Sequence, residues 1–228
     1  MSAFCALAFC LLASGAWGDS VSIQNPSFES FNTLDQSGGC NTGSTACFNN
    51  GPIPGWSTIA GGFGSFAPNS TFFSLPLPDG SIVAFTNGGT LSQTLAGISL
   101  LPNVLYTLSV DVGRRLDVNG ANYSLSLRDG SFFCTSGSQS IDLITAGTFQ
   151  DITLTCATGA TVPGGFLGIE LTGDGRQIDF DNVRLDVTGS TVSTPEPSVL
   201  VLMLTALGVV GLLFARSRWN HHLQVASS

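Results

Sequence analysis

The 228-residue chain contains no lysine, and its two histidines, His221 and His222, lie close to the C-terminal end. Its basic residues are seven arginines, set against fifteen acidic residues, and the formal net charge is −8. A protein that binds nucleic acid needs a basic face to neutralise phosphates. The composition therefore argues against nucleic acid as a partner.

The same shortage limits acid–base chemistry. Between residues 19 and 190 there is neither His nor Lys, so proton transfer would fall to Asp, Glu or Tyr, and no Ser or Cys nucleophile has its usual base. A glycosidase with two carboxylates, drawn from Glu29, Glu170 and the aspartates, stays possible. These side chains are better explained as solvent-facing charges or cation ligands, so the inventory predicts a protein without catalytic activity.

Tryptophan and tyrosine are scarce as well, and Trp56 is the only tryptophan between residues 19 and 190. It is interpreted as a core residue more readily than as a platform for a sugar ring. Phe72 and Phe73 are adjacent, as are Phe132 and Phe133, and strand geometry turns one ring of each pair away from the core. Phe73 and Phe133 are therefore expected as exposed rings, with Trp56 as a further candidate for ligand binding.

What the chain has in abundance is glycine, 28 residues, and apolar residues, 43 %, with only 10 % charged. This balance favours short strands and turns. Apolar side chains alternate with polar ones at Tyr106, Leu108, Val110 and Val112, and the alternation returns in the runs 123–128, 152–156 and 167–172. With turn signals between the runs, residues 19–190 are predicted to form one antiparallel β-sandwich of two sheets.

Both ends of the chain carry apolar segments. Residues 1–18 end with small residues, Ala16 and Gly18, before Asp19, which predicts a signal peptide. A stretch ending at Cys10 only loosely resembles a lipoprotein box. Residues 198–215 contain no charge and would form about 27 Å of helix, enough to cross a bilayer. Arginines follow this run, so residues 216–228 are expected as a short cytoplasmic tail, and residues 191–197 as a linker.

Four cysteines remain once a signal peptide is removed, which suits two disulfides in an exported protein. Cys40 and Cys47 bracket a polar loop, whereas Cys134 and Cys156 lie in strand-like runs a hairpin's distance apart. We expect each of these two pairs to form a bridge. A zinc site is less consistent with the spacing, because the C-x-x-C pairs and a nearby His are missing.

The C-terminal segment resembles the PEP-CTERM sorting family. The resemblance rests on Pro195, Glu196 and Pro197, the apolar span after them, and Arg216 and Arg218. In that family an exosortase-type enzyme is thought to cleave near the motif. The resemblance implies an exported, single-pass precursor in the inner membrane that is processed and then placed at the cell surface or outside the cell.

Three patches of residues 19–190 together resemble galactose-binding-like jelly rolls, a superfamily with many carbohydrate-binding modules. They are 25–29 (NPSFE), 53–56 (IPGW) and 178–185 (IDFDNVRL), with Pro26 in place of the usual Gly. The run 79–95 and the strand after it also look like central strands of PEP-CTERM ectodomains. The resemblance implies a jelly-roll β-sandwich.

Asp181 is a candidate cation ligand. It shares the phase of Val183, Leu185 and Val187, so its carboxylate should point inward, where it needs an arginine, backbone N–H groups or a cation as partner. A bulge that turns the side chain to water is an equal alternative. In the jelly-roll superfamily a structural calcium often joins the opening and closing strands, and the matching positions here are Glu29 and Asp181, with Asp179 or Asn25 able to complete the shell.

Arg114 and Arg115 form a compact charged group with Asp111 and Asp117. The pair could bind a carboxylate-bearing polysaccharide, although mutual salt bridges at the surface are favoured. The sequence as a whole predicts a non-catalytic surface protein that contributes to an exopolysaccharide matrix or biofilm by weak glycan binding. The alternative is a structural or adhesive protein with protein partners and no sugar site.

Overall fold

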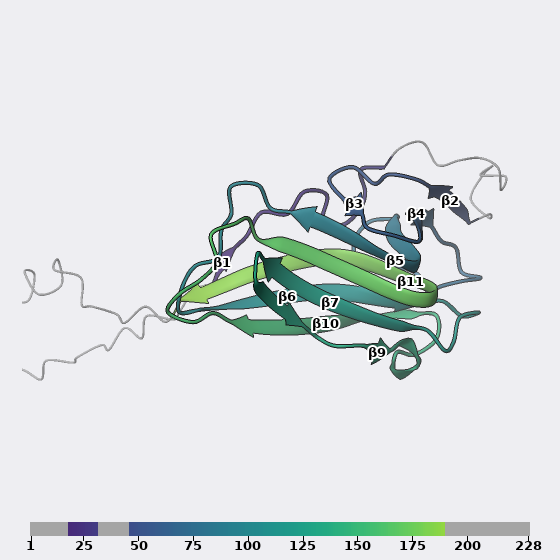
Figure 1. Ribbon diagram of the computed structural model, residues 1–228. Helices are drawn as coiled ribbons and strands as arrows, with labels where there is room; N and C mark the ends of the chain where they lie inside the picture. Colours follow the sequence, from purple (N-terminus) through teal and green to yellow (C-terminus); the bar gives the residue numbers. More distant parts are fainter. Residues whose placement is uncertain (1–17, 32–45, 190–228) are drawn as a thin grey trace, which may run out of the picture. The chain divides into compact units, whose positions relative to one another are not determined.

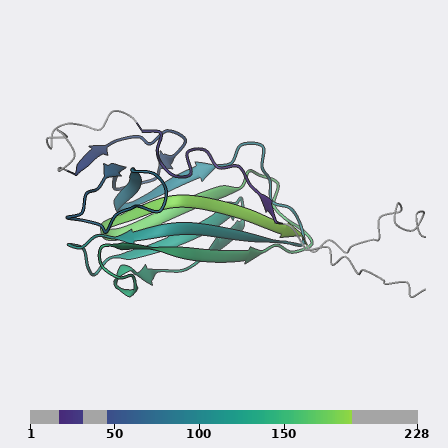
Figure 2. The same cartoon turned by 180° about the vertical axis from the view of Figure 1, so that it is seen from behind.

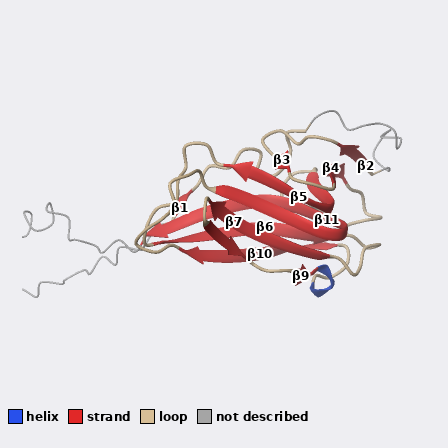
Figure 3. Cartoon of the chain, viewed as in Figure 1, coloured by secondary structure: helices blue, strands red, loops and turns tan. Residues whose placement is uncertain are grey.

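The computed structural model describes residues 18–31 and 46–189, and these form an antiparallel β-protein with one short 3₁₀ helix (Figures 1 and 3). The strands are β1 (Asp19–Ser20), β2 (Cys47–Asn50), β3 (Ser57–Thr58), β4 (Gly62–Ala67), β5 (Val83–Thr94), β6 (Val104–Arg114), β7 (Asn122–Asp129), β8 (Phe132–Thr135), β9 (Gln139–Ser140), β10 (Thr148–Ala157) and β11 (Gly168–Gly189); the 3₁₀ helix is η2 (Ile141–Leu143).

Two long strands, β5 and β11, hold the layers together. The main path of the sheet runs β10-β6-β11-β5-β4-β2, and every pairing is antiparallel. The first part of β11, residues 168–174, lies between β5 and β7, whereas residues 179–189 pair with β6. The register shifts between Gly173 and Gln177, where β11 passes from one layer to the other. The predicted antiparallel sandwich is confirmed at this level.

The core follows the period-two pattern of the sequence. The inward residues of β6, β7 and the start of β11, with Leu167 directly before β11, are almost fully buried: Tyr106, Leu108, Val110, Val112, Tyr123, Leu125, Leu127, Leu167, Ile169 and Leu171. Successive residues of β5 point to opposite faces of the sheet and pack in two different hydrophobic clusters. Ala84 packs in the main core, while Val83 and Phe85 pack with Phe66 and Phe73 in a second cluster on the other face. The sheet in that region is therefore covered on both faces.

The predicted bridge between Cys134 and Cys156 is present and ties β8 to β10, with a Cα–Cα distance of 6.1 Å. These strands belong to different layers, so the bridge closes the sandwich along one side. The bridge predicted between Cys40 and Cys47 cannot be placed in the same way, because Cys40 lies outside the described residues.

The beginning and the end of the described chain lie side by side (Figure 2). Asp19 pairs with Val187 and Ser20 with Asp186, so β1 lies along the last residues of β11. None of the helices in residues 18–31 and 46–189 is long and apolar enough to cross a membrane. The expected signal peptide, the motif at 195–197 and the span at 198–215 all lie outside the described residues.

Candidate functional site

A row of six residues crosses the sheet on the face of the second cluster. In register order they are Asn50, Gly64, Phe85, Asp179, Gly113 and Phe149, one from each strand of the path β2-β4-β5-β11-β6-β10. Directly paired residues of neighbouring strands project from the same face. An acid, Asp179, thus lies in the middle of the sheet, between a phenylalanine and a glycine.

A cavity of about 320 Å³ opens over this face. Its lining comes from four strands and the segment after β6: Phe48, Asn50, Phe66, Phe85, Asn87, Arg115 and Gln177. The three rings form an apolar wall, and three amides and one guanidinium supply the polar groups. A few placed polar groups in an apolar cavity are the usual composition of a small-molecule site.

The Arg115 guanidinium is held on several sides. It lies 4.3 Å from the centre of the Phe72 ring and 5.5 Å from that of Phe66, within the range of cation–π attraction. Its Nε and Nη2 donate to the two carboxylate oxygens of Asp117 at 2.9 and 2.7 Å, and its Nη1 donates to Gln177 Oε1 at 2.6 Å. The guanidinium is thereby fixed at the cavity wall.

Gln177 connects the cavity to the buried acid. Because its Oε1 accepts from Arg115, its Nε2 is the group that faces Asp179, and it donates to Asp179 Oδ1 at 2.8 Å. Asp179 is fully buried, and its Oδ2 has no hydrogen-bond partner among the described residues. Burial raises the pKa of Asp179 to about 7, against the opposing effects of the Gln177 hydrogen bond and the Arg115 charge.

A carboxyl group with such a pKa exists in both protonation states near neutral pH. It can donate a proton and take one back, which is the requirement for general acid–base catalysis. Sequence reasoning looked for histidine and lysine and missed this group. The signal available in the sequence was a pair of acids, Asp179 and Asp181, inside an otherwise apolar run.

Two other cavities, of about 350 and 450 Å³, are lined mainly by Ser, Thr and amide side chains. The first has one carboxylate in its lining, Asp174, which is exposed, and the second has none. Neither has a buried acid linked to its lining, so the cavity at Arg115 and Gln177 is the candidate active site.

Two of the predicted calcium ligands, Glu29 and Asp181, contact the same loop at residues 79–82. Glu29 Oε1 accepts from the backbone N–H groups of Ser81 and Ile82, both at 2.7 Å. Asp181 is fully buried and accepts from Asp79 N at 3.0 Å and from Asn182 N at 2.8 Å. The register does shift between Asp181 and Arg184, but the carboxylate points inward, so the alternative of a side chain turned to water is wrong.

Backbone N–H groups therefore supply the partner that Asp181 requires. Burial raises its pKa to about 7, opposed by these two hydrogen bonds. Asp179, the third predicted calcium ligand, accepts a hydrogen bond from Gln177 and does not contact the loop at 79–82. Within the described ranges no three His, Cys, Asp or Glu side chains form a group that could hold a metal ion, so backbone carbonyls would have to complete a calcium shell.

The remaining candidates lie elsewhere. Trp56 is a core residue: it packs on Phe28 at 5.3 Å and donates its indole N–H to Asn25 O. Phe73 is fully buried, so its expected exposure is wrong; residues 68–82 form no strand but fold over the sheet, with Phe72 partly exposed. Phe133 is 62 % exposed on β8, as expected, but does not line the candidate site.

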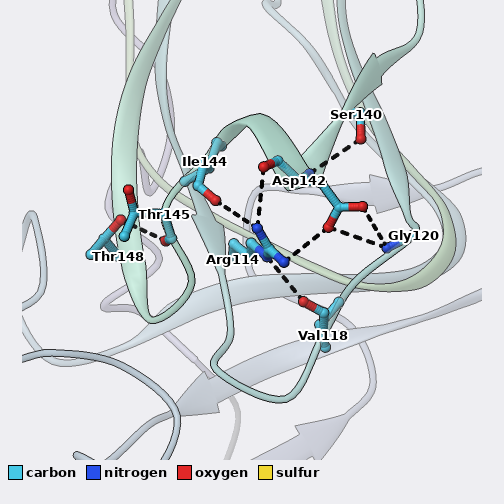
Figure 4. A network of polar contacts seen from close by, with 8 residues as sticks. All are labelled: Arg114, Val118, Gly120, Ser140, Asp142, Ile144, Thr145 and Thr148. Carbon is cyan, nitrogen blue, oxygen red and sulfur yellow. Dashed lines mark hydrogen bonds and ion pairs between the residues drawn. The ribbon is translucent and has the colours of Figure 1, made fainter.

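The two adjacent arginines differ in role. Arg114 is a structural residue: it donates to the carbonyls of Val118, Asp142 and Ile144 and pairs with the Asp142 carboxylate at 3.0 Å (Figure 4). Arg115 and Asp117 form the expected salt bridge. Asp111 does not join the group, because it pairs with Arg184 and accepts from Asn182.

Fold and site together define a β-sandwich protein with an aromatic cavity beside a buried aspartate whose pKa is raised. The chain belongs to the HpiC1-like family of cyclases, which matches residues 19–186. No curated protein shows significant similarity to the chain.

Solved structures of cyclases are similar over most of the chain. A Stig cyclase, Fisc from Fischerella sp. TAU, in complex with (3Z)-3-(1-methyl-2-pyrrolidinylidene)-3H-indole, has a TM-score of 0.60 at 26 % identity and covers 76 % of this chain and 99 % of its own. A cyclase from Fischerella sp. TAU in complex with 4-(1H-indol-3-yl)butan-2-one has a TM-score of 0.57 at 26 % identity, with 76 % and 100 % covered. The apo form of a Fischerella sp. cyclase has a TM-score of 0.60 at 25 % identity, with 78 % and 100 % covered.

Membership of a cyclase family overturns the predicted function. The expectations of a non-catalytic matrix or adhesive protein, and of no enzymatic activity, were wrong. The physical reason is that an inventory of residue types treats all aspartates alike, whereas burial moves the pKa of Asp179 into the range of an acid–base catalyst.

Proposed function

We propose that this protein is a cyclase that closes a ring in a small substrate with an indole-type aromatic group, with Asp179 as the acid. The observation that carries the proposal is the buried Asp179 carboxyl, linked through Gln177 to a cavity walled by phenylalanine rings. Family membership and the indole compounds bound by similar cyclases support it.

The phenylalanine rings bind the aromatic group of the substrate, and Asp179 transfers the proton. Phe48, Phe66 and Phe85 stack on the aromatic group and exclude water, which strengthens electrostatic interactions in the cavity. Asp179 lies behind Gln177 and does not line the cavity, so the Gln177 amide must turn aside when the substrate binds. Asp179 in its neutral form then donates its proton to the substrate, and the cation so formed is attacked by a π-bond of the same molecule, which closes the ring. The Asp179 carboxylate then takes a proton from the closed product, so that acid and proton count are restored.

The test uses the full chain and an indole substrate with an unsaturated side chain, with ring closure followed as a product of unchanged mass. Asp179→Asn keeps the shape but cannot donate the acidic proton, and a loss of about 10²- to 10⁴-fold in rate is expected. Asp174→Asn, at an exposed position, is the matched control. Because the neutral acid is required, the rate should fall as pH rises through about 7. Full activity of Asp179→Asn would refute the assignment.

Export is a second part of the proposal. The apolar segment at 1–18, the motif at 195–197 and the span at 198–215 support a jelly-roll enzyme that is exported, anchored as a single-pass precursor and released by an exosortase-type enzyme. The Cys134–Cys156 bridge fits an oxidising compartment. In cells with an exosortase, mass spectrometry should find a mature start at Asp19 and an end near Pro195; intact full-length chain alone would refute it.

A further inference from the structure

Arg114 and Arg115 are adjacent and equally buried, with side-chain exposures of 18 % and 17 %, yet one serves the fold and the other faces the cavity. The Arg114 contacts all go to carbonyls and a carboxylate of the 118–144 segment (Figure 4). Arg115 lines the cavity. The pair therefore offers a comparison of two arginines matched in position and burial.

The Arg115 guanidinium has hydrogen-bonding capacity left for a ligand. A guanidinium carries five N–H groups. The contacts to Asp117 and Gln177 use one N–H each on Nε, Nη1 and Nη2. One N–H on Nη1 and one on Nη2 have no acceptor among the described residues, and guanidinium N–H groups suit a carboxylate or carbonyl oxygen.

The side chains that line the cavity also carry charge of one sign, which is positive. Arg115 is the single charged residue among those that line it. Its counterion, Asp117, has a side chain that is 55 % exposed, so water screens the negative charge more than it screens the guanidinium held between Phe66 and Phe72. A cationic ligand would meet the positive charge of the guanidinium there, whereas an anionic or carbonyl-bearing ligand would meet two N–H donors that have no acceptor among the described residues.

We infer that Arg115 is a specificity-determining residue that selects aromatic ligands carrying a carboxylate or carbonyl acceptor and rejects those carrying an amine. The inference rests on the proposed function, because it takes the cavity at Arg115 and Gln177 as the substrate site. It adds the chemical class of the group that the substrate presents to the polar wall.

Three probes share one indolylethyl frame and differ in the terminal group: 3-(1H-indol-3-yl)propanoate, 4-(1H-indol-3-yl)butan-2-one and 2-(1H-indol-3-yl)ethan-1-amine. Their dissociation constants for the full chain are measured by calorimetry. The propanoate should bind more tightly than the amine by about tenfold or more, with the ketone between them, as expected for a charge-assisted hydrogen bond.

Two variants test the residue. Arg115→Met keeps the length of the side chain but removes the donors, and the three affinities should become nearly equal. Asp117→Asn, at an exposed position, removes the competing carboxylate and should increase the preference for propanoate. Arg114→Met is the matched control: it lowers the melting temperature, but the ratio of the three affinities should stay at the wild-type value, because a loss of stability weakens all three alike.

The outcomes separate the inference from the function on which it rests. If the probes bind but Arg115→Met and Asp117→Asn leave the ratios of their affinities at the wild-type values, the role of Arg115 is refuted while the cyclase proposal stands. A wild-type preference for the amine would also refute it. If none of the three indole compounds binds the wild-type chain, the aromatic substrate class is wrong, and the inference falls with it.

Discussion

Glu29 and Asp181, near opposite ends of the described chain, are held by the same short loop. Ser81 and Ile82 donate to Glu29, and Asp79 donates to Asp181. Gly80, in the middle of the loop, has a φ of +74°, and a Cβ there would collide with the Glu29 carboxylate. Because β5 begins directly after this loop and carries Phe85 into the cavity wall, the contact connects Glu29 and Asp181, near the two ends of the described residues, to the candidate site.

Replacing Glu29 should loosen this loop. Glu29→Ala removes the acceptor of two backbone N–H groups, and we expect a loss of about 1 to 2 kcal/mol in the free energy of unfolding. Glu29→Gln keeps the Oε1 acceptor and should lose less. Urea unfolding measures both, with Ser30→Ala as the neighbouring control. If Glu29→Ala were as stable as the wild type, the loop contact would contribute nothing.

Stability should decrease from mildly acidic to neutral pH. Burial raises the pKa of both Asp179 and Asp181 to about 7 in the folded chain, well above the ordinary value of 3.8. A raised folded pKa means that the folded state binds protons more tightly than the unfolded state. The stabilisation is therefore fully present below the ordinary value and is lost as pH rises through about 7.

The expected fall in the free energy of unfolding between pH 5 and pH 8 is on the order of a few kcal/mol. The hydrogen bond from Arg115 lowers the pKa of Asp117, which acts in the opposite direction, but only at lower pH. Urea titrations without calcium, at intervals across this range, measure the slope. Asp179→Asn should reduce the slope and leave the part that Asp181 contributes, and a variant with the wild-type slope would show that Asp179 does not titrate there.

The strands could be read from the sequence because their signal is local. Tyr106, Leu108 and Val110 are buried and the residues between them are more exposed, as the alternation predicted. The prediction that Phe73 is exposed was wrong because it assumed strand geometry for Phe72 and Phe73. Residues 68–82 are instead a loop that folds over the sheet. The direction of a loop side chain depends on contacts far away in the sequence.

The candidate site could not be read from the sequence in the same way. Phe48, Phe85 and Gln177 come together through pairings between strands that are distant in the chain. Alternation also fails for residues 178–181, all of which are buried, because the sheet is covered on both faces there. The inward phase of Asp181 was correct, but nothing local showed that Asp179, two residues earlier, contacts Gln177 and not the loop at 79–82.

Removing the disulfide should destabilise the sandwich. Cys134 and Cys156 are separated by 22 residues, and closing a loop of that length contributes about 3 kcal/mol in the chain-entropy description. For a domain of this size, that corresponds to a fall of roughly 6 to 12 °C in melting temperature. The double variant Cys134→Ser, Cys156→Ser is compared with the wild type by calorimetry. A reducing agent should lower the melting temperature of the wild type by more than that of the double variant, which keeps Cys40 and Cys47, and equal melting temperatures of the oxidised wild type and the double variant would show that the bridge adds no stability.

Calcium remains a prediction, and the geometry makes its test sharper. If Glu29 and Asp181 share a cation, the folded state gains about 2.7 kcal/mol when free calcium is a hundred times its dissociation constant, and chelation removes that gain. The melting temperature should then be lower in EDTA than in millimolar calcium by roughly 5 to 10 °C. Asp181→Asn keeps one oxygen donor but removes the charge that a hard cation needs, so the response should disappear.

The pH profile distinguishes a bound cation from the backbone N–H groups that already contact Asp181. A divalent cation favours the ionised carboxylate, so calcium should reduce the part of the pH dependence that Asp181 contributes and leave the part from Asp179, which contacts Gln177. Asp179→Asn in saturating calcium should then show almost no slope between pH 5 and pH 8. If EDTA and calcium give the same melting temperature and the same slope, Glu29 and Asp181 are held by the backbone N–H groups around them, and no cation is shared.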